Sequence, residues 1–426
     1  MRRREFLKAG LAAAGAAALG PGFWQRVFAA PAQPGPGPYG PLRSPDANGL
    51  MLPDGFSSRI VARSGLPVLG TAYLWHVWPD GAFCFPSGDG GWFHVVNSEA
   101  PPPADIPVAS DVQRIGGASA IRFDASGHIV DAYRVLAGTR SNCAGGPTPW
   151  GTWLSCEEFD DSVRGGSTAS AGNAWECDPS GVAAPIKRTA LGTFKHEAAA
   201  VDPATNRVYM TEDLPDGRFY RFTPASFTGT GADLDAGSLQ AAEIVGPSSG
   251  PWSVVWHAIP DPAASSMSTR NQAPATTPFD GGEGCFLDAG IVYITTKGDN
   301  RVWRYHVATE TLDVLYDAAD HPDPALTGVD NLIVSAAGDV YVAEDGGNME
   351  IVVITPDNEF APMLRATGPQ HGFVNPLPSP ASEIPTVSEI TGLAFSPDGT
   401  RLYFNSQRAF ALGVTYEVTG PFRATA

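Results

Sequence analysis

Residues 196–213 read HEAAAVDPATNRVYMTED, and this stretch decides the fold because its pattern recurs along the chain. An acidic residue opens an apolar strand, a turn rich in Pro, Asn or Asp follows, and a second strand places an aliphatic residue beside Tyr. The same order is found in residues 283–297 (EGCFLDAGIVYITTK), 330–345 (DNLIVSAAGDVYVAED) and 389–407 (EITGLAFSPDGTRLYFNSQ). Such a repeated unit is typical of radially arranged sheets. The sequence therefore predicts an all-β fold, a β-propeller with insertions.

The earlier part of the chain carries weaker versions of the same unit. These are residues 71–77 (TAYLWHV), residues 119–124 (SAIRFD) and the segment around Trp150. With 48 Gly and 39 Pro in the chain, short strands separated by turns are favoured over long helices. We expect six blades, with five or seven as alternatives.

The first 30 residues have the layout of a signal peptide. Arg3-Arg4-Glu5-Phe6-Leu7-Lys8 is a twin-arginine pattern, and a short Ala-rich apolar run follows it. A cleavage site is expected at or just after Val27-Phe28-Ala29. This pattern predicts twin-arginine export to the periplasm or the extracellular space.

Three further segments follow the signal. Residues 31–53 form a Pro/Gly-rich leader, and residues 54–426 are expected to form a single propeller domain. An insertion at about residues 248–278 is rich in Pro, Ala, Ser and Thr. It is too long for an ordinary turn, and we expect either a lid over the channel mouth or a disordered surface insertion.

The charge and the cysteine content limit the function classes. The formal net charge is −18, and loss of the signal, with five basic residues and one acidic residue, would bring it to −22. So acidic a surface disfavours binding to nucleic acid or to anionic lipid. We expect no membrane span, and we expect a monomer. The five cysteines are an odd number, and Cys156 with Cys177 is the pair to examine first for a disulfide.

Residues 141–158, SNCAGGPTPWGTWLSCEE, carry the strongest chemical signal. Cys143 lies in a Gly/Pro turn, and a short aromatic strand after it ends at Glu157 and Glu158. A soft thiolate close to hard carboxylates indicates a transition-metal site with a harder partner ion.

The acidic residues that open the repeats point to the same conclusion. In a propeller the innermost strand of each blade lines the central channel, so Glu197, Glu283, Asp330 and Glu389 should converge at one mouth. Carboxylates this close repel one another unless cations compensate them. The repeats therefore predict a metal cluster there. The alternative is that these acids are turn or Asx-type capping residues facing water.

The Cys143 string followed by Glu157-Glu158 resembles the signature of PhoX-type alkaline phosphatases, and the later acidic elements follow in that family's order. The resemblance extends from about Val112 to Arg408. It implies a six-bladed propeller with iron and calcium at the channel mouth and hydrolysis of a phosphate monoester or diester. The metal ligands that it implies are Cys143, Glu157 or Glu158, Glu197 and Glu283, with Asp330, Asn331 and Glu344 as further candidates. The catalytic residues that we expect are Cys143, Glu197 and Glu283 of this set, together with Lys297 of this chain.

One position departs from the family pattern. Active members carry Arg two residues before the Glu that matches Glu283, whereas this chain has Gly281. A cationic side chain normally helps to bind phosphate, and Lys297, Arg218 or Lys195 could supply it. Two other functions remain open: a calcium-dependent lactonase or esterase, and a non-catalytic propeller that binds a ligand and is stabilised by metal.

Overall fold

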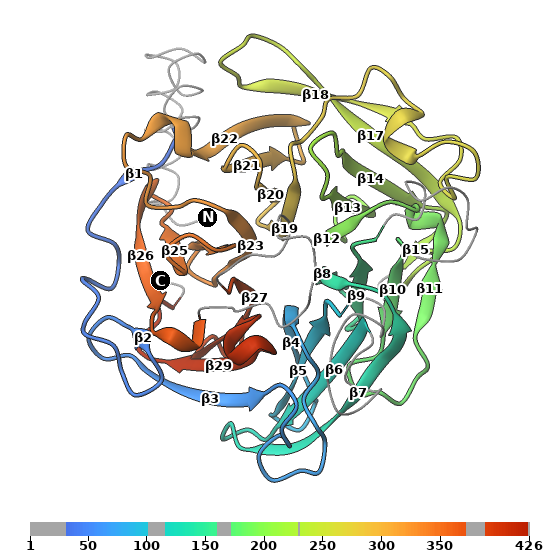
Figure 1. The fold of residues 1–426 in the computed structure, drawn as a ribbon. Helices are drawn as coiled ribbons and strands as arrows, with labels where there is room; N and C mark the ends of the chain where they lie inside the picture. Colours follow the sequence, from blue (N-terminus) through green and yellow to red (C-terminus); the bar gives the residue numbers. More distant parts are fainter. Residues whose placement is uncertain (1–30, 101–115, 160–171, 229–230, 372–387, 425–426) are drawn as a thin grey trace, which may run out of the picture.

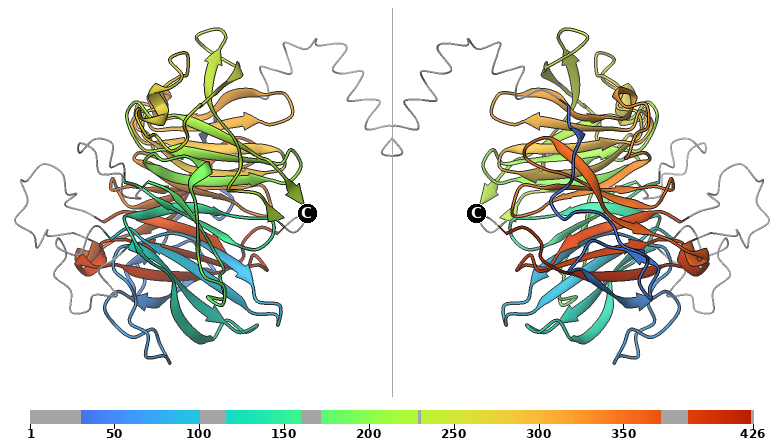
Figure 2. Two further views of the ribbon diagram at one scale, coloured as in Figure 1. Left: turned by 90° about the vertical axis from the view of Figure 1, so that its right-hand side faces the viewer. Right: turned by 90° about the vertical axis from the view of Figure 1, so that its left-hand side faces the viewer.

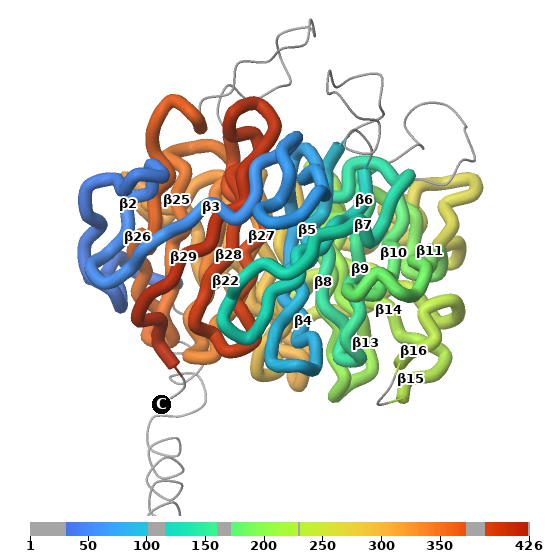
Figure 3. Tube along the Cα trace, turned by 90° about the horizontal axis from the view of Figure 1, so that it is seen from below, coloured from blue at the N-terminus to red at the C-terminus, as the bar shows by residue number. Residues whose placement is uncertain are grey.

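The computed structural model describes residues 31–100, 116–159, 172–228, 231–371 and 388–424. In these ranges the chain consists of β-strands and short 3₁₀ turns. Figure 1 shows the sheets arranged radially around one axis, in the order of the chain. In the side views the strands run between the two faces of a thick disc (Figures 2 and 3). The all-β propeller expected from the sequence is confirmed; the signal peptide expected at residues 1–30 lies outside the described residues.

Six of the described strands line the central channel. These inner strands are β4 (Pro79–Pro86), β8 (Asn142–Pro147), β12 (His196–Asp202), β19 (Gly282–Asp288), β23 (Val329–Val334) and β27 (Ile390–Phe395). Consecutive members of this set contact each other, and β27 contacts β4, so the inner strands form a closed ring. Closure matters because it brings residues from distant parts of the chain to the same channel mouth.

Antiparallel strands extend each inner strand outward. The sheet of β4 adds β5 (Trp92–Ser98), β6 (Gly116–Phe123) and β7 (Ile129–Thr139), and that of β8 adds β9 (Trp153–Glu157), β10 (Ala174–Cys177) and β11 (Ile186–Arg188). The sheet of β12 adds β13 (Arg207–Glu212), β14 (Phe219–Pro224) and β17 (Gly237–Val245), and that of β19 adds β20 (Ile291–Thr296), β21 (Arg301–His306) and β22 (Thr311–Asp317). The sheet of β23 adds β24 (Val340–Glu344), β25 (Glu350–Ile354) and β26 (Glu359–Ala366), and that of β27 adds β28 (Arg401–Ser406) and β29 (Val414–Thr419).

A strand near the start of the described chain completes the sheet that contains its last two strands. Strand β3 (Ser57–Arg63) pairs antiparallel with β29, so backbone hydrogen bonds join the two ends of the ring. Figure 3 shows these two strands side by side. The leader contributes β1 (Gln33–Pro34) and β2 (Leu50–Met51), which both pair with the edge strand β26. Pairing of this kind covers an edge that would otherwise expose unpaired backbone groups.

The insertion at residues 248–278 does not form the expected lid in its first half. Residues Trp252–Ala258 form strand β18, which pairs with β17 and, at one end, with β22. This strand joins two sheets at the outer edge of the disc (Figure 1). Trp252 packs against Trp303, with ring centroids 5.8 Å apart, and Trp256 packs against Tyr305 at 5.7 Å. Packing of these two half-buried Trp side chains, with Val254 buried between them in sequence, holds the segment against the outer strands.

The remaining elements are short. They are β15 (Phe227–Thr228), β16 (Gly231–Ala232), and the 3₁₀ turns η4 (Thr189–Leu191), η5 (Thr269–Asn271), η6 (Ala318–Asp320), η7 (Pro369–His371) and η8 (Ala409–Ala411). Among the described residues, no helix combines the length and the apolar character needed to cross a membrane. All five cysteines are free and buried. Cys156 and Cys177 are not joined, because they lie at opposite ends of the β9–β10 ladder, opposite Ala174 and Trp153.

Apolar side chains of neighbouring sheets form the core. The Tyr that recurs in the second strand of each repeat is part of it, since Tyr209, Tyr341 and Tyr403 are fully buried. Near the start of every inner strand, the register with the second strand shifts by one residue. Such a β-bulge places two residues opposite one and changes the direction in which a side chain points. These shifts lie beside the residues that form the candidate site.

Candidate metal centre

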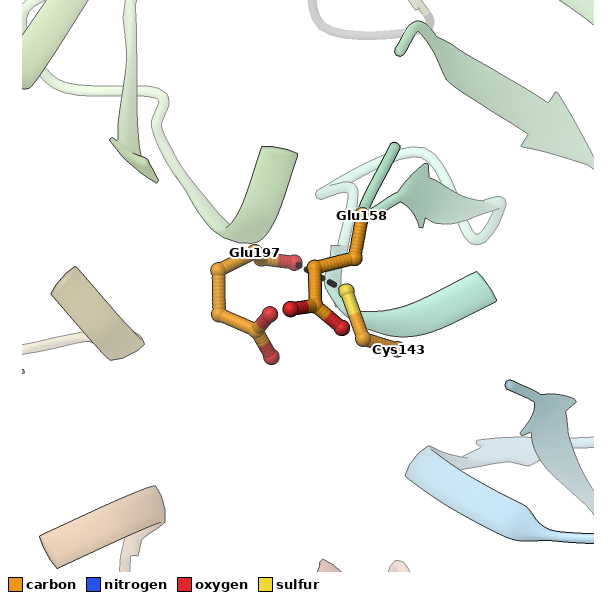
Figure 4. A group of neighbouring side chains, drawn as sticks. All are labelled: Cys143, Glu158 and Glu197. Atoms are coloured by element: carbon orange, nitrogen blue, oxygen red, sulfur yellow. Dashed lines mark hydrogen bonds between the residues drawn. The ribbon is translucent and has the colours of Figure 1, made fainter. Parts of the chain in front are cut away.

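Two groups of side chains at one mouth of the channel could each hold a metal ion. The first consists of Cys143, Glu158 and Glu197, and the second of Glu197, Glu283 and Asp330. In each group, one ligand atom per residue lies within 4.8 Å of the others. Figure 4 shows the side chains of the first group pointing toward one another from β8, the end of β9 and β12. Glu197 belongs to both groups, so the two form one continuous centre.

The β-bulges explain why these residues meet. The register shifts begin after Asn142 in β8, His196 in β12, Gly282 in β19 and Val329 in β23. The next residue in each strand is a member of the centre: Cys143, Glu197, Glu283 or Asp330. Strand β4 shifts in the same way after Pro79, and its next residue is Asp80. In five of the six inner strands the bulge thus places a potential ligand at the mouth, whereas in β27 the shift begins after Thr391 and the next residue is Gly392.

The Ala-Gly-Gly part of the cysteine motif allows close packing of the inner strands. A Cβ atom on Gly146 would lie 1.7 Å from the carbonyl oxygen of Ala199 in the neighbouring β12. A Cβ on Gly145 would lie 1.8 Å from the carbonyl oxygen of Leu154. Only glycine fits such approaches. The glycines therefore let β8 approach β12 closely enough for Cys143, 2% exposed, to reach the centre.

The Cys143 thiol is a neutral donor in the protein without metal. It donates a hydrogen bond from Sγ to the carbonyl oxygen of His196 at 3.1 Å. Burial raises the pKa of Cys143 well above its ordinary value, and the nearby Glu197 and Glu158 raise it further. A bound cation would reverse this effect, because coordination stabilises the thiolate.

The carboxylates of the second group also favour protonation unless a cation is present. Burial raises the pKa of Glu197 and of Asp330 well above their ordinary values, and in both cases Glu283 raises it further. Burial raises the pKa of Glu283 to about 8, although Lys297 acts in the opposite direction. Like charges in one buried site need a compensating cation. The thiolate and carboxylate donors fit a softer transition metal and a harder oxygen-binding ion, respectively.

A second layer of charged residues surrounds this centre. Lys195 contacts Glu158 at 2.5 Å and Asp213 at 2.7 Å. Lys297 contacts Glu283 at 2.6 Å and Asp345 at 3.2 Å. Burial opposes ionisation of both aspartates, but Lys297 together with Lys195 at Asp213, and with Glu389 and Arg408 at Asp345, holds their pKa values below the ordinary value. At the mouth, Glu197 and Asp330 thus form no ion pair with Lys or Arg among the described residues, whereas Glu158, Glu283, Asp213 and Asp345 are paired to lysines.

The opposite side of the mouth is organised in the same way. Arg408 forms ion pairs with Glu389 and, at 3.6 Å, with Glu99. The side-chain amide of Gln407 donates to Asp80 at 2.8 Å and to Glu99 at 2.9 Å. Asp80, Glu99, Asp213, Asp345 and Arg408 were not among the residues expected at the site. Their signal is positional, because Glu99, Asp213 and Asp345 directly follow a second strand, as Glu158 does.

Three expected ligands lie outside the two groups. The carboxylate of Glu157 accepts hydrogen bonds from the backbone amides of Arg140 and Asn173, each at 3.2 Å. That of Glu344 accepts from the amides of Thr327 at 2.9 Å and Glu350 at 3.0 Å. Both end a second strand and satisfy backbone amides of the adjoining loops.

The third of these is Asn331. It donates its amide to Asp330 at 2.8 Å, and its carbonyl oxygen accepts from the amide of Gly392 at 2.9 Å. It therefore orients Asp330 and links β23 to β27.

The three candidate phosphate-binding cations differ in their positions. Lys297 and Lys195 lie at the centre, as described above. The guanidinium of Arg218 donates to Thr276 at 2.7 Å and to the carbonyl oxygen of Gly217 at 3.1 Å, and it does not contact the two ligand groups. Lys297 lies beside Gly281, since its backbone amide donates to the Gly281 carbonyl oxygen at 2.7 Å.

His196 has a structural environment. Its Nε2 lies 3.0 Å from the carbonyl oxygen of Gly192, and its ring stacks on Phe194 with a centroid distance of 3.6 Å. It is absent from both ligand groups found among the described residues. Its carbonyl oxygen, however, accepts the hydrogen bond of the Cys143 thiol. It thus contributes to the centre through its backbone.

One family model and several solved structures are similar to this chain. The family model of alkaline phosphatase PhoX matches residues 109–409. Pseudomonas fluorescens PhoX in complex with vanadate, a transition state analogue, has a TM-score of 0.71 and 19% identity, over 93% of this chain and 98% of that chain. The gluconolactonase XC5397 from Xanthomonas campestris has a TM-score of 0.43 and 13% identity, over 90% and 99% of the two chains. No curated protein sequence matches this chain.

The family match spans most of the chain, and it includes the cysteine motif and every inner strand from β8 to β27. The chain belongs to the PhoX family of alkaline phosphatases.

Proposed function

We propose that this protein is an exported phosphatase that hydrolyses phosphate monoesters or diesters at an iron and calcium centre in the channel mouth. The observation that carries the proposal is the pair of ligand groups joined by Glu197, with a thiol in only one of them. The complex of Pseudomonas fluorescens PhoX with vanadate supports the reaction class, because vanadate is a transition state analogue in that protein.

The chemistry of the donors assigns each group to a metal. Cys143, Glu158 and Glu197 would hold iron, because thiolate is a soft ligand. Glu197, Glu283 and Asp330 would hold calcium, because that ion takes oxygen ligands. When bound, such ions neutralise phosphate charge and lower the pKa of water or hydroxyl oxygen. The protein holds the ligand side chains in fixed positions on its strands, so that they need little reorganisation during the reaction.

Lys297 is the residue that we assign to phosphate binding. It lies beside Gly281, where the family pattern has Arg, and its ammonium group contacts Glu283 of the centre at 2.6 Å. The side chain is 35% exposed, so it can be approached from solvent. A cation in this position would attract the phosphate dianion and offset the acidity of the mouth.

Export by the twin-arginine route is part of the proposal. The Arg3-Arg4 pattern supports it, and this route suits a protein that acquires its metals before it leaves the cell. We propose a periplasmic or extracellular location. A fusion of residues 1–30 to a reporter should be exported, and Arg3→Lys together with Arg4→Lys should stop export.

Metal analysis combined with turnover tests the function. Natively exported protein should contain iron and calcium and should hydrolyse p-nitrophenyl phosphate. Activity should disappear in chelator and return with calcium. Glu197→Gln should remove both metals, because this residue is shared, whereas the exposed Glu359→Gln should retain them.

Other results would contradict the proposal. Calcium without iron, together with lactone hydrolysis, would favour a lactonase. A fully metal-loaded protein that turns over no phosphate monoester or diester would favour a binding propeller.

A further inference from the structure

Cationic side chains of the protein bridge neighbouring sheets at the channel mouth. Lys195, which directly precedes β12, contacts Glu158 at the end of β9 and Asp213 at the end of β13. It thereby joins the sheet of β8 to the sheet of β12. The Lys195 side chain is 27% exposed, and its two partners are 15% and 14% exposed. The contact therefore lies in a mostly buried setting, where ion pairs are screened less than on the surface.

The same device recurs at two other junctions. Lys297 follows β20 and contacts Glu283 in β19 and Asp345 after β24, which joins the sheets of β19 and β23. Arg408 follows β28 and contacts Glu389 before β27 and Glu99 after β5, which joins the sheets of β27 and β4. Around the ring, these bridges occupy every second junction between sheets.

The junction between β12 and β19 has a different composition. Glu197 and Glu283 face each other there, and in the described part of the chain Glu197 has no ion pair with Lys or Arg. It shares this junction with Asp330 from the next inner strand. The negative charge that the protein itself leaves uncompensated is thus concentrated around Glu197.

We propose that Lys195, Lys297 and Arg408 are built-in counter-ions that exclude additional calcium from the carboxylates outside the ligand groups, namely Asp213, Asp345, Glu99 and Glu389, and confine metal ions to the two groups sharing Glu197. An ammonium group and a calcium ion compete for the same carboxylate oxygens. Without Arg408, Glu389 and Glu99 would offer hard oxygen ligands to calcium, and without Lys195, Asp213 would do so beside the group member Glu158. This inference rests on the metal centre of the proposed function; its counter-ions lie outside the ligand groups, although Lys195 and Lys297 also contact the group members Glu158 and Glu283.

Removing one counter-ion tests the inference by a gain of binding. Lys195→Met keeps an unbranched side chain one atom shorter than Lys and removes its charge. After stripping and reloading with calcium, the variant should bind one more calcium equivalent than the wild type, measured by elemental analysis and isothermal titration calorimetry. Its melting temperature should also rise more steeply with calcium concentration. Arg408→Met provides an independent variant with the same expectation.

Two controls separate charge from structure. Lys195→Arg keeps the positive charge and should bind as much calcium as the wild type. Lys187→Met removes a lysine from β11, outside the mouth, and should also leave calcium content unchanged.

The outcomes distinguish this inference from the proposed function. If Lys195→Met and Arg408→Met both bind no more calcium than the wild type, the inference is overturned, whatever the activity. If the wild type binds no metal, the proposed function fails, while a gain of calcium in the variants would still support the role of the counter-ions.

Discussion

Replacing Glu283 with Gln should remove a pH-dependent loss of stability from the metal-free protein. Glu283 is 3% exposed, and burial raises its pKa to about 8, against an ordinary value of 4.5 and despite Lys297. The folded state therefore holds this proton more tightly than the unfolded state does. The stabilisation that comes from the protonated Glu283 is fully present below about pH 4.5, and it is lost as the pH rises toward the folded-state pKa of about 8.

The size of the effect follows from the shift. One pKa unit corresponds to about 1.36 kcal/mol, so the interval between 4.5 and about 8 corresponds to about 5 kcal/mol. Gln has nearly the same shape but cannot ionise. Relative to Glu283→Gln, the metal-free wild type should therefore lose about 5 kcal/mol of unfolding free energy across this interval.

Urea unfolding in the presence of chelator measures this difference between about pH 5 and about pH 8. The exposed Glu359→Gln serves as the matched control and should track the wild type. With calcium and iron bound, the slope should change sign, because metal binding requires deprotonated ligands. A difference between wild type and Glu283→Gln that stays constant over this range, or grows in favour of the wild type, would refute the reasoning.

Three further changes probe single residues. Cys143→Ser should abolish iron binding and the visible absorption of the bound iron. Cys84→Ser, which alters a buried thiol of β4, should keep the iron and its absorption. Retention of iron by Cys143→Ser would disprove the thiolate assignment. Glu157→Gln should lower the unfolding free energy by about 1–2 kcal/mol and retain the metals, because it weakens hydrogen bonds to backbone amides. The neighbouring variant Glu158→Gln should lose iron. Elemental analysis and urea unfolding compare the two variants, and equal metal loss would contradict the different roles of the two residues. Lys297→Met should lower kcat/KM for p-nitrophenyl phosphate by about 10²–10³-fold, with partial recovery in Lys297→Arg; unchanged steady-state kinetics would remove Lys297 from the site.

The fold could be predicted from the sequence because its determinants are local and repeated. Each unit combines an apolar strand, a turn and a second strand with Tyr, and repetition of this unit requires neighbouring units to bury each other's faces. The recurrent residues Tyr209, Tyr341 and Tyr403 are fully buried between sheets, as this reasoning requires. The insertion was harder to predict, since Trp252 and Trp256 gain their places in an outer strand only from partners such as Trp303.

The sequence also determined which kinds of ligand the mouth contains, since Cys143, Glu197, Glu283 and Asp330 occupy marked positions of the motif and the repeats. Only the tertiary structure decided which of two adjacent carboxylates faces the channel. Glu157 ends β9 and binds backbone amides, whereas Glu158, one residue later, joins Cys143. Closure of the ring likewise brought Lys195 and Lys297 to carboxylates of neighbouring sheets. The physical reason is that a strand reverses side-chain direction at every residue and a β-bulge alters that alternation, so a shift of one position separates a structural acid from a ligand.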